Sequence, residues 1–169
     1  MFYDFLCGRY HMVVSINGET MKIVEMIHSH TEILHDLEKL CFSKPWSRKA
    51  LEDQVDNPRA YFVTAMEGEA VLGYGGMHCA ADECYIDNIA VFRRYRGRGL
   101  GTAIIERLAQ EARRRGCRFI SLEVRVSNKK AIRLYERCGF QREGERKNFY
   151  SAPMEDGLIL TRWLKARCR

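Results

Sequence analysis

A glycine- and arginine-rich segment between a strand-like run and a long amphipathic helix constrains this chain more than any other feature. The segment reads RRYRGRGLGT at positions 93–102, directly after the apolar run 85–92. Glycines let backbone N–H groups come close to a bound anion, and a helix N-terminus adds the positive end of its dipole. The pattern predicts a strand–loop–helix unit that grips the pyrophosphate of a ligand.

Two common phosphate-binding loops do not fit this segment. A P-loop requires Gly, four residues and then Gly-Lys-Ser/Thr, a string that the chain lacks. The dinucleotide fingerprint G-x-G-x-x-G needs a glycine where Thr102 stands, and it belongs near the start of a doubly wound fold. The pattern that fits is R-x-x-G-x-G, formed by Arg96, Gly99 and Gly101. The alternative is a glycine-rich turn that only joins a strand to a helix.

Length and composition indicate one globular domain. The chain has 169 residues, of which 46% are hydrophobic and 30% charged. No run approaches the roughly 18 apolar residues of a membrane span, so we expect no membrane partner. Asp4, Arg9 and His11 interrupt the hydrophobic residues of the N-terminus, which therefore lacks a clean secretory h-region. We expect a cytoplasmic protein with an N-terminal extension of uncertain origin at residues 1–20 and a single domain at 21–169.

The cysteines do not form a recognisable framework. There are seven, an odd number, and none belongs to a C-x-x-C pair. Without a secretory signal, we interpret them as reduced, partly buried thiols rather than as disulfides or zinc ligands. We therefore expect no metal.

The basic residues gather in two places. The net charge of +6 is concentrated in the glycine-rich segment and at 113–118, near the end of the following helix. Cations at a helix C-terminus complement the dipole and need no ligand. Nucleic-acid binding is an alternative, but no helix-turn-helix, zinc-finger or RNP pattern accompanies the charge. Ligand phosphates account for the first cluster more economically, and we expect no direct nucleic-acid partner.

Periodicity predicts a mixed α/β order. Strands are expected at 22–27, 61–66, 70–79, 84–92, 119–124, 140–148 and 158–164. Helices are expected at 31–41, from a Ser47 cap to about 57, from the glycine-rich segment to about 115, and at 128–138. The first helix should bury Ile33, Leu34, Leu37 and Leu40. The strand–helix–strand unit around Gly99 requires one parallel strand pair within a mostly antiparallel sheet flanked by helices.

Several motifs in this order resemble the GNAT superfamily of N-acyltransferases, and within it the RimI-type ribosomal-protein-alanine N-acetyltransferases. They are FSxPWS at 42–47, NIAV at 88–91, RGRGLG at 96–101, LEVRxSN at 122–128 and AxxLYxxxGF at 131–140. The resemblance covers residues 21–164. It implies the GNAT fold and acetyl-CoA as the acetyl donor.

The resemblance assigns roles to single residues. Glu123 matches the general base of the family pattern. Tyr135 is the candidate acid on chemical grounds, because a phenol with a pKa of about 10 is close enough to a thiol to return a proton to the leaving thiolate. The alternatives are a solvent-facing strand glutamate and a core tyrosine. The candidate cofactor-binding residues are Ile89, Ala90, Val91, Arg96, Gly97, Arg98, Gly99, Leu100, Gly101, Thr102, Asn128 and Ala131. The candidate substrate-binding residues are Phe42, Pro45, Trp46, Asp87 and Tyr150.

The chemistry favours an α-amine as acceptor. Its pKa is about 7.7–8.0, against about 10.4 for lysine, so one carboxylate suffices to remove its proton near neutral pH. We expect acetylation of a protein N-terminus, most consistent with the N-terminal alanine of a small-subunit ribosomal protein. Asp87, Glu123, Glu155 and Asp156 are expected to make the peptide side acidic. The hairpin turn at 151–156 is shorter than expected, which leaves the preferred N-terminal residue open.

Two alternatives stay open. The first keeps the fold but acetylates a lysine or a small amine, whose higher pKa demands a stronger or more buried base. The second is a basic domain that binds the ribosome or RNA through its two arginine clusters. The sequence does not predict an oligomeric state.

Overall fold

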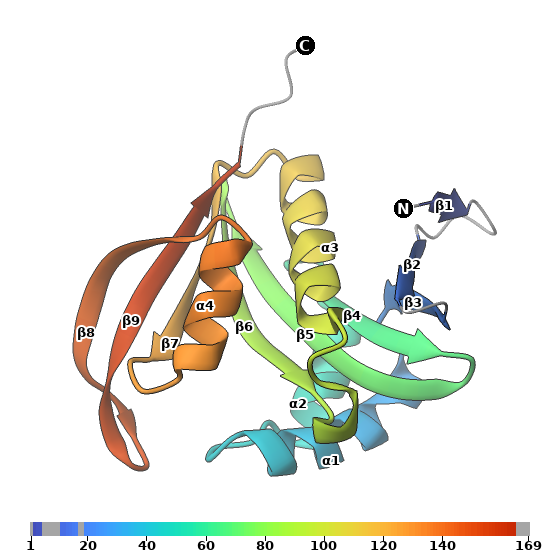
Figure 1. Ribbon diagram of the computed structural model, residues 1–169, viewed down its shortest axis with the longest axis horizontal. Coiled ribbons are helices and arrows are strands. Elements are labelled where there is room, and N and C mark those ends of the chain that lie inside the picture. The colour runs from blue at the N-terminus through green and yellow to red at the C-terminus, as the bar shows by residue number, and fades with distance from the viewer. Residues whose placement is uncertain (1, 5–10, 17–18, 165–169) are drawn as a thin grey trace.

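The computed structural model describes residues 2–4, 11–16 and 19–164. Within this part of the chain, nine strands form one sheet in the order β1-β2-β3-β4-β5-β6-β7-β9-β8 (Figure 1). The strands are β1 (Phe2–Asp4), β2 (His11–Ile16), β3 (Glu19–Glu25), β4 (Ala60–Glu67), β5 (Ala70–Ala80), β6 (Glu83–Val91), β7 (Phe119–Arg125), β8 (Gln141–Ser151) and β9 (Met154–Trp163). The helices are α1 (Thr31–Cys41), α2 (Arg48–Val55), α3 (Leu100–Arg114) and α4 (Lys129–Arg137), with 3-10 turns η1 (His28–His30) and η2 (Arg93–Tyr95). The predicted mixed α/β fold is confirmed.

The helices form where periodicity and capping predict them. Helix α1 has the predicted bounds, and the Ser47 hydroxyl caps α2 by accepting a 3.1 Å hydrogen bond from the Ala50 N–H. The predicted buried face of α1 is partly wrong. Leu34 and Leu37 are buried, whereas Ile33 and Leu40 are 40% and 73% exposed. Residues 34, 37, 38 and 41 follow the helical period onto the sheet, and 33 and 40 fall on its flanks.

The two faces of the sheet bury different sets of side chains. Figure 1 shows α3 and α4 on one side of the sheet and α1 and α2 on the other. Two hydrophobic clusters result, one beneath α3 (the α3 cluster) and one beneath α1 and α2 (the α1–α2 cluster). Successive side chains of β4 point to opposite faces of the sheet, so Tyr61 and Val63 pack in the α3 cluster and Ala60 and Phe62 in the α1–α2 cluster. Both faces are therefore covered.

A β-bulge at Asp87 changes which face of β6 is buried where. The register passes from Met77 opposite Ile86 to Gly76 opposite Asn88, so Asp87 has no partner on β5. Ile86 belongs to the α3 cluster, and beyond the bulge the odd-numbered Ile89 takes that face. A bulge reorients the following side chains in this way.

The parallel strand pair is short, and the two strands then separate. Strands β6 and β7 pair only from Glu83 to Tyr85 and from Phe119 to Ser121, and Figure 1 shows them diverging beyond that point. The separation leaves room between residues 86–89 of β6 and 122–125 of β7. The predicted parallel pair is confirmed.

The C-terminal hairpin is longer than the sequence predicts. Strands β8 and β9 reach Ser151 and Met154, leaving a turn of only Ala152 and Pro153. A register shift between Arg146 and Tyr150 hides the alternation, because three residues of β8 oppose one of β9. Strand periodicity fails at such a bulge.

The N-terminal strands extend the sheet beyond β3. Strand β2 pairs antiparallel with β3 from Met12 to Ile16, and Met12 is buried in the α3 cluster. The division into an extension at 1–20 and a domain at 21–169 stays a prediction, and residues 165–169 lie outside the described part. Among the described helices, none is long and apolar enough to cross a membrane.

One cysteine prediction is wrong. Cys79 and Cys84 form a disulfide, although all seven cysteines were expected to be reduced. They lie directly opposite each other across the β5–β6 turn. Sequence spacing alone does not reveal this register, because it depends on where the hairpin turns. Among the described cysteines, Cys41, Cys117 and Cys138 are free thiols.

Candidate active site

A cavity of about 650 Å³ lies where β6 and β7 separate. Its walls come from the α1–α2 loop, β6, β7, α4 and the end of the β8–β9 hairpin. The sequence-predicted residues that line it are Phe42, Trp46, Asp87, Ile89, Glu123, Asn128, Ala131, Tyr135 and Tyr150. The remaining candidates, Pro45, Ala90, Val91 and the 96–102 segment, are not among its lining residues. The structure thus gathers both catalytic candidates and most of the substrate candidates in one place.

Glu123 lies on β7 at the open edge of this cavity. Its neighbours Leu122 and Val124 point into the α3 cluster, so Glu123 takes the opposite face. Its side chain is 25% exposed, and its Oε1 lies 3.5 Å from Nε of Arg146 on β8. The cation beside the carboxylate was not expected from the sequence.

Tyr135 lies on α4 and lines the same cavity. Its ring packs against Phe140 with centroids 5.7 Å apart. Burial raises its pKa far above the usual value, and Tyr150 and Cys138 add to the shift. The phenol therefore keeps its proton at neutral pH. Packing and exposure to the cavity coexist at this residue, so the core and acid interpretations are not exclusive.

The glycine-rich segment forms a loop that opens directly into α3. Gly97 and Gly99 adopt φ of +80° and +82°, and Gly99 is the N-cap of α3. Left-handed backbone of this kind favours glycine. Gly101 has a different reason to be glycine, because a Cβ there would lie 2.9 Å from Leu134 of α4. The first backbone N–H groups of the helix have no partner within the helix, which suits an anion.

The arginines of this loop bind the protein itself. Arg96 donates from Nε to the Val91 carbonyl oxygen at 2.8 Å and from Nη2 to Cys41 Sγ at 3.3 Å. Arg98 lies 3.6 Å from Glu67 and 5.7 Å from the ring centroid of Tyr95. Arg96 thus fixes the end of β6 against α1, a role that sequence analysis did not separate from phosphate binding.

Glu38 organises one wall of the cavity from below the surface. It is fully buried on α1 and accepts hydrogen bonds from the Trp46 backbone N–H at 2.8 Å and from Asn88 Nδ2 at 2.9 Å. The Tyr74 hydroxyl is its third donor. Burial raises the pKa of Glu38. Trp46 and Asn88 both line the cavity, so this carboxylate connects the α1–α2 loop to β6.

Arg125 connects β7 to the end of the β8–β9 hairpin, on the side of the cavity opposite Glu38. Its Nη1 and Nη2 donate to the carbonyl oxygens of Pro153 and Ala152 at 3.0 and 2.9 Å. It pairs with Glu155 at 3.1 Å, and Nη2 lies 3.5 Å from Ser43 Oγ of the α1–α2 loop. Its guanidinium carbon is 4.3 Å from the centroid of the Tyr150 ring. Arg125 belongs to the LEVRxSN motif, but the sequence alone does not reveal that it bridges β7, the hairpin end and the α1–α2 loop.

The carboxylates that were expected to make the peptide side of the cavity acidic are paired with basic side chains. Glu155 pairs with Arg125, Asp156 with Lys147 at 2.7 Å, and Glu123 with Arg146. Asp87 bonds His78 Nδ1 at 2.6 Å, and burial raises the pKa of its carboxyl. Each of the four carboxylates thus has a basic side chain beside it, which corrects the expectation of an acidic surface.

Two further predictions have mixed outcomes. Asn128 lines the cavity, but its Oδ1 also caps α4 by accepting from the Ala131 N–H at 3.2 Å. Pro45 is exposed in the loop and does not form the wall beside Trp46.

Comparison with known proteins agrees with this geometry. The model of the acetyltransferase (GNAT) family matches residues 31–140. The ribosomal protein bS18-alanine N-acetyltransferase of Escherichia coli K12 is 34% identical over 123 residues, 73% of this chain and 81% of that protein. The crystal structure of the ribosomal-protein-S18-alanine N-acetyltransferase from E. coli superposes with a TM-score of 0.79 at 28% identity, covering 88% of this chain and 97% of that one.

A third protein shares the fold alone. Arabidopsis thaliana NAA60, solved in complex with acetyl-CoA, has a TM-score of 0.78 at 20% identity and covers 86% of this chain and 99% of its own. The family match over most of the chain, together with the E. coli relative, establishes that this protein belongs to the GNAT acetyltransferase family.

Proposed function

We propose that this protein transfers the acetyl group of acetyl-CoA to the α-amine of a protein N-terminus, with the N-terminal alanine of a small-subunit ribosomal protein as its substrate. The observation that carries the proposal is the meeting of Glu123 and Tyr135 in one cavity between the diverging strands. The E. coli relative is named for the same reaction on bS18.

Glu123 acts as the general base. An α-ammonium loses its proton at about pH 7.7–8.0, so the carboxylate, directly or through one water, needs to supply only modest help. The freed amine forms the new C–N bond at the acetyl carbonyl carbon. Arg146 keeps the carboxylate in place at the cavity edge.

Tyr135 acts as the general acid. Acetyl-CoA supplies an acetyl thioester, and its C–S bond breaks as the amide forms. The Tyr135 hydroxyl, held protonated by burial, gives its proton to the departing sulfur. The second proton of the attacking nitrogen, lost as the amide forms, restores the Tyr135 hydroxyl. The base and the acid thus come from two different elements of the cavity wall, β7 and α4.

The loop from Arg96 to Thr102 is the site for the pyrophosphate. Its two left-handed glycines and the N-terminus of α3 fit an anion. A Cβ at Gly97 would meet no atom within 4 Å, so nothing crowds this part of the loop. We infer that backbone N–H groups of the loop, rather than the Arg96 side chain, bind the pyrophosphate. The backbone of Ile89 and Val91 and the side chain of Asn128 border the pantetheine arm.

The peptide N-terminus enters between Trp46 and Tyr150. These aromatic side chains line the cavity from the α1–α2 loop and the β8–β9 hairpin. Glu38 and Arg125 hold the two segments, which favours an entrance that is already formed before the peptide binds.

The test measures free-thiol release from acetyl-CoA with four peptides. Three begin with Ala, Ser or Met, and the fourth is N-acetyl-Ala followed by an internal lysine. We expect turnover with the Ala peptide and none with the blocked one. Turnover only with the blocked peptide assigns the enzyme to lysine and contradicts the proposal.

A domain that binds nucleic acid is less favoured by the contacts of its arginines. Arg114 and Arg115 pair with Glu111 at 2.6 and 2.9 Å, and Arg118 pairs with Asp82. These residues form most of the second basic cluster, and each of them has a carboxylate of the protein beside it, although Arg114 and Arg115 share that of Glu111. Phosphate-backbone binding also weakens steeply with salt, whereas binding of acetyl-CoA should largely survive it.

A further inference from the structure

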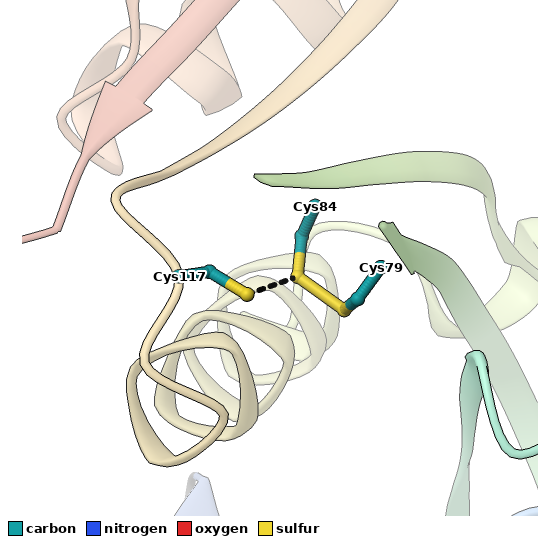
Figure 2. A group of neighbouring side chains, drawn as sticks. All are labelled: Cys79, Cys84 and Cys117. Carbon is teal, nitrogen blue, oxygen red and sulfur yellow. Dashed lines mark hydrogen bonds between the residues drawn. A yellow bond between two sulfur atoms is a disulfide. The ribbon is translucent and has the colours of Figure 1, made fainter. Parts of the chain in front are cut away.

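Three cysteines from three separate segments meet at the point where β6 and β7 begin to pair. Cys79 lies near the end of β5, Cys84 near the start of β6, and Cys117 in the segment after α3 (Figure 2). Their sulfur atoms all lie within 4.8 Å of one another, and Cys117 Sγ is 3.2 Å from Cys84 Sγ. None of the three lines the cavity described above. The acetyl-transfer chemistry does not use this cluster.

The donor set consists of sulfur alone. Among the described residues, no histidine or carboxylate belongs to the group. Asp82 and Glu83, which lie between Cys79 and Cys84 in the sequence, form ion pairs with Arg118. Soft thiolate ligands select thiophilic ions such as Cu(I), whereas oxygen-preferring ions such as Mg²⁺ and Ca²⁺ need carboxylates or carbonyl groups.

The number and burial of the sulfur atoms limit which metal ion the cluster can bind. Cys84 and Cys117 are buried and Cys79 is half-buried, so the site is shielded from water and reached from the Cys79 side. A closed zinc site needs four protein ligands, and the group offers three. With metal–sulfur distances of about 2.3 Å, three sulfurs around one ion lie about 4 Å apart. In the oxidised protein the sulfurs of Cys84 and Cys117 are 3.2 Å apart and those of Cys79 and Cys84 are bonded, so reduction must let the three sulfurs separate before an ion fits between them.

We propose that the reduced cluster of Cys79, Cys84 and Cys117 binds one Cu(I) ion in a three-sulfur site. A dithiol reductant first converts the Cys79–Cys84 disulfide to two thiols by giving two electrons and two protons, and is itself oxidised to a disulfide. The three thiols then lose their protons as they bind the ion. The bound ion connects the β5–β6 hairpin to the segment between α3 and β7, a link that the disulfide does not provide.

The test is a titration of the reduced full-length protein under anaerobic conditions. After reduction and removal of the dithiol, a thiol assay must count seven free cysteines. Cu(I) is then added against the chromophoric chelator bicinchoninate, with native mass spectrometry for stoichiometry. We expect one Cu(I) per chain. Zn²⁺ in the same assay should bind more weakly.

Single cysteine substitutions test which thiols bind the ion. Cys84→Ser and Cys117→Ser should each lower Cu(I) affinity at least about 100-fold, because removing a ligand costs no less than removing a residue that only orients one. Cys138→Ser is the matched control, because it is also a buried free thiol but lies outside the group. It should keep the wild-type affinity and stoichiometry.

A second readout uses the unmodified protein. Cu(I) should protect Cys79, Cys84 and Cys117 from alkylation while Cys41 still reacts, and it should raise Tm of the reduced protein by mass action. The proposal is overturned by a fully reduced protein that binds no stoichiometric Cu(I), by tighter Zn²⁺ binding, or by equal losses in the Cys84 and Cys138 variants.

Discussion

The two sides of the cavity are built in different ways. The side that carries Glu123 and Tyr135 stands on β7 and α4, whose own hydrogen bonds and buried neighbours fix the side chains. The side that carries Trp46 and Tyr150 belongs to a loop and a hairpin end, held by Glu38 and Arg125 from other parts of the chain. We infer that the first side performs the chemistry and the second selects the peptide. Substitutions on the first side should therefore lower kcat, and substitutions on the second side should raise the KM for the peptide.

The largest effect should come from the base. Glu123→Gln keeps the shape of the side chain and removes its proton affinity, so kcat should fall at least about 100-fold. The KM for acetyl-CoA should stay unchanged in a thiol-release assay. Glu145→Gln is the control, because Glu145 lies on exposed β8 away from the cavity. Normal turnover in Glu123→Gln removes this residue from the mechanism.

The second-largest loss of kcat should come from removing the general acid, Tyr135. Tyr135→Phe keeps the ring that packs on Phe140 and removes the proton donor, so kcat should fall by about 100-fold, near the lower limit for general acids. Tm should change little. Tyr61→Phe is the matched control, since Tyr61 is a buried tyrosine outside the cavity. A loss of Tm without a loss of kcat supports the core interpretation instead.

On the other side, Glu38→Gln tests the buried connection. The amide of Gln places a donor among three donors, which should lower the free energy of unfolding by about 1–3 kcal/mol. The KM for the peptide should rise because Trp46 loses its anchor. Denaturant unfolding and steady-state kinetics check both effects. Unchanged stability and KM contradict the assigned role.

The same variant isolates a pH dependence. Burial raises the pKa of Glu38 above its usual 4.5, so the native state holds this proton where the unfolded chain has lost it. Its contribution to stability is therefore present below pH 4.5 and is lost as the pH rises through the native pKa. The stability of wild type minus that of Glu38→Gln should fall as the pH rises from about 4.5 through the raised native pKa. A difference that grows with pH shows that the three donors hold the carboxylate ionised.

The smallest effect should come from the rim. Arg125→Lys keeps the charge but loses the planar group that bonds two carbonyl oxygens and covers Tyr150. The KM for an Ala peptide should rise about tenfold, equivalent to about 1.4 kcal/mol, with kcat nearly unchanged. Arg142→Lys, on exposed β8 and paired with Glu136, is the control.

Local features of the sequence placed Glu123 on a strand and Tyr135 on a short helix, where the structure has them. The LEVR string and the spacing of Tyr135 allowed this because a strand alternates its faces and a helix repeats every 3.6 residues. The catalytic roles of the two residues, which rest on the motif resemblance and on the chemistry of the phenol, stay predictions. The glycines of the 96–102 loop were likewise recognisable, although Gly101 serves the contact between α3 and α4 rather than a turn.

The second side depends on contacts between distant residues. Glu38 lies 50 positions from Asn88, and Arg125 lies 82 from Ser43. In the sequence, Glu38 resembles a solvent-facing helix residue, and only the packing of α1 on β5 and β6 reveals its burial. The Cys79–Cys84 disulfide was missed for the same reason, since it depends on the register of a hairpin.

The most direct test of the division between the two sides is steady-state kinetics of Glu123→Gln and Arg125→Lys with one Ala peptide, varied against saturating acetyl-CoA. We predict a kcat defect with near-normal peptide KM in the first and a peptide KM defect with near-normal kcat in the second. The reverse pattern, or the same pattern in both variants, contradicts the assignment of chemistry to β7 and α4 and of peptide selection to the loop and hairpin.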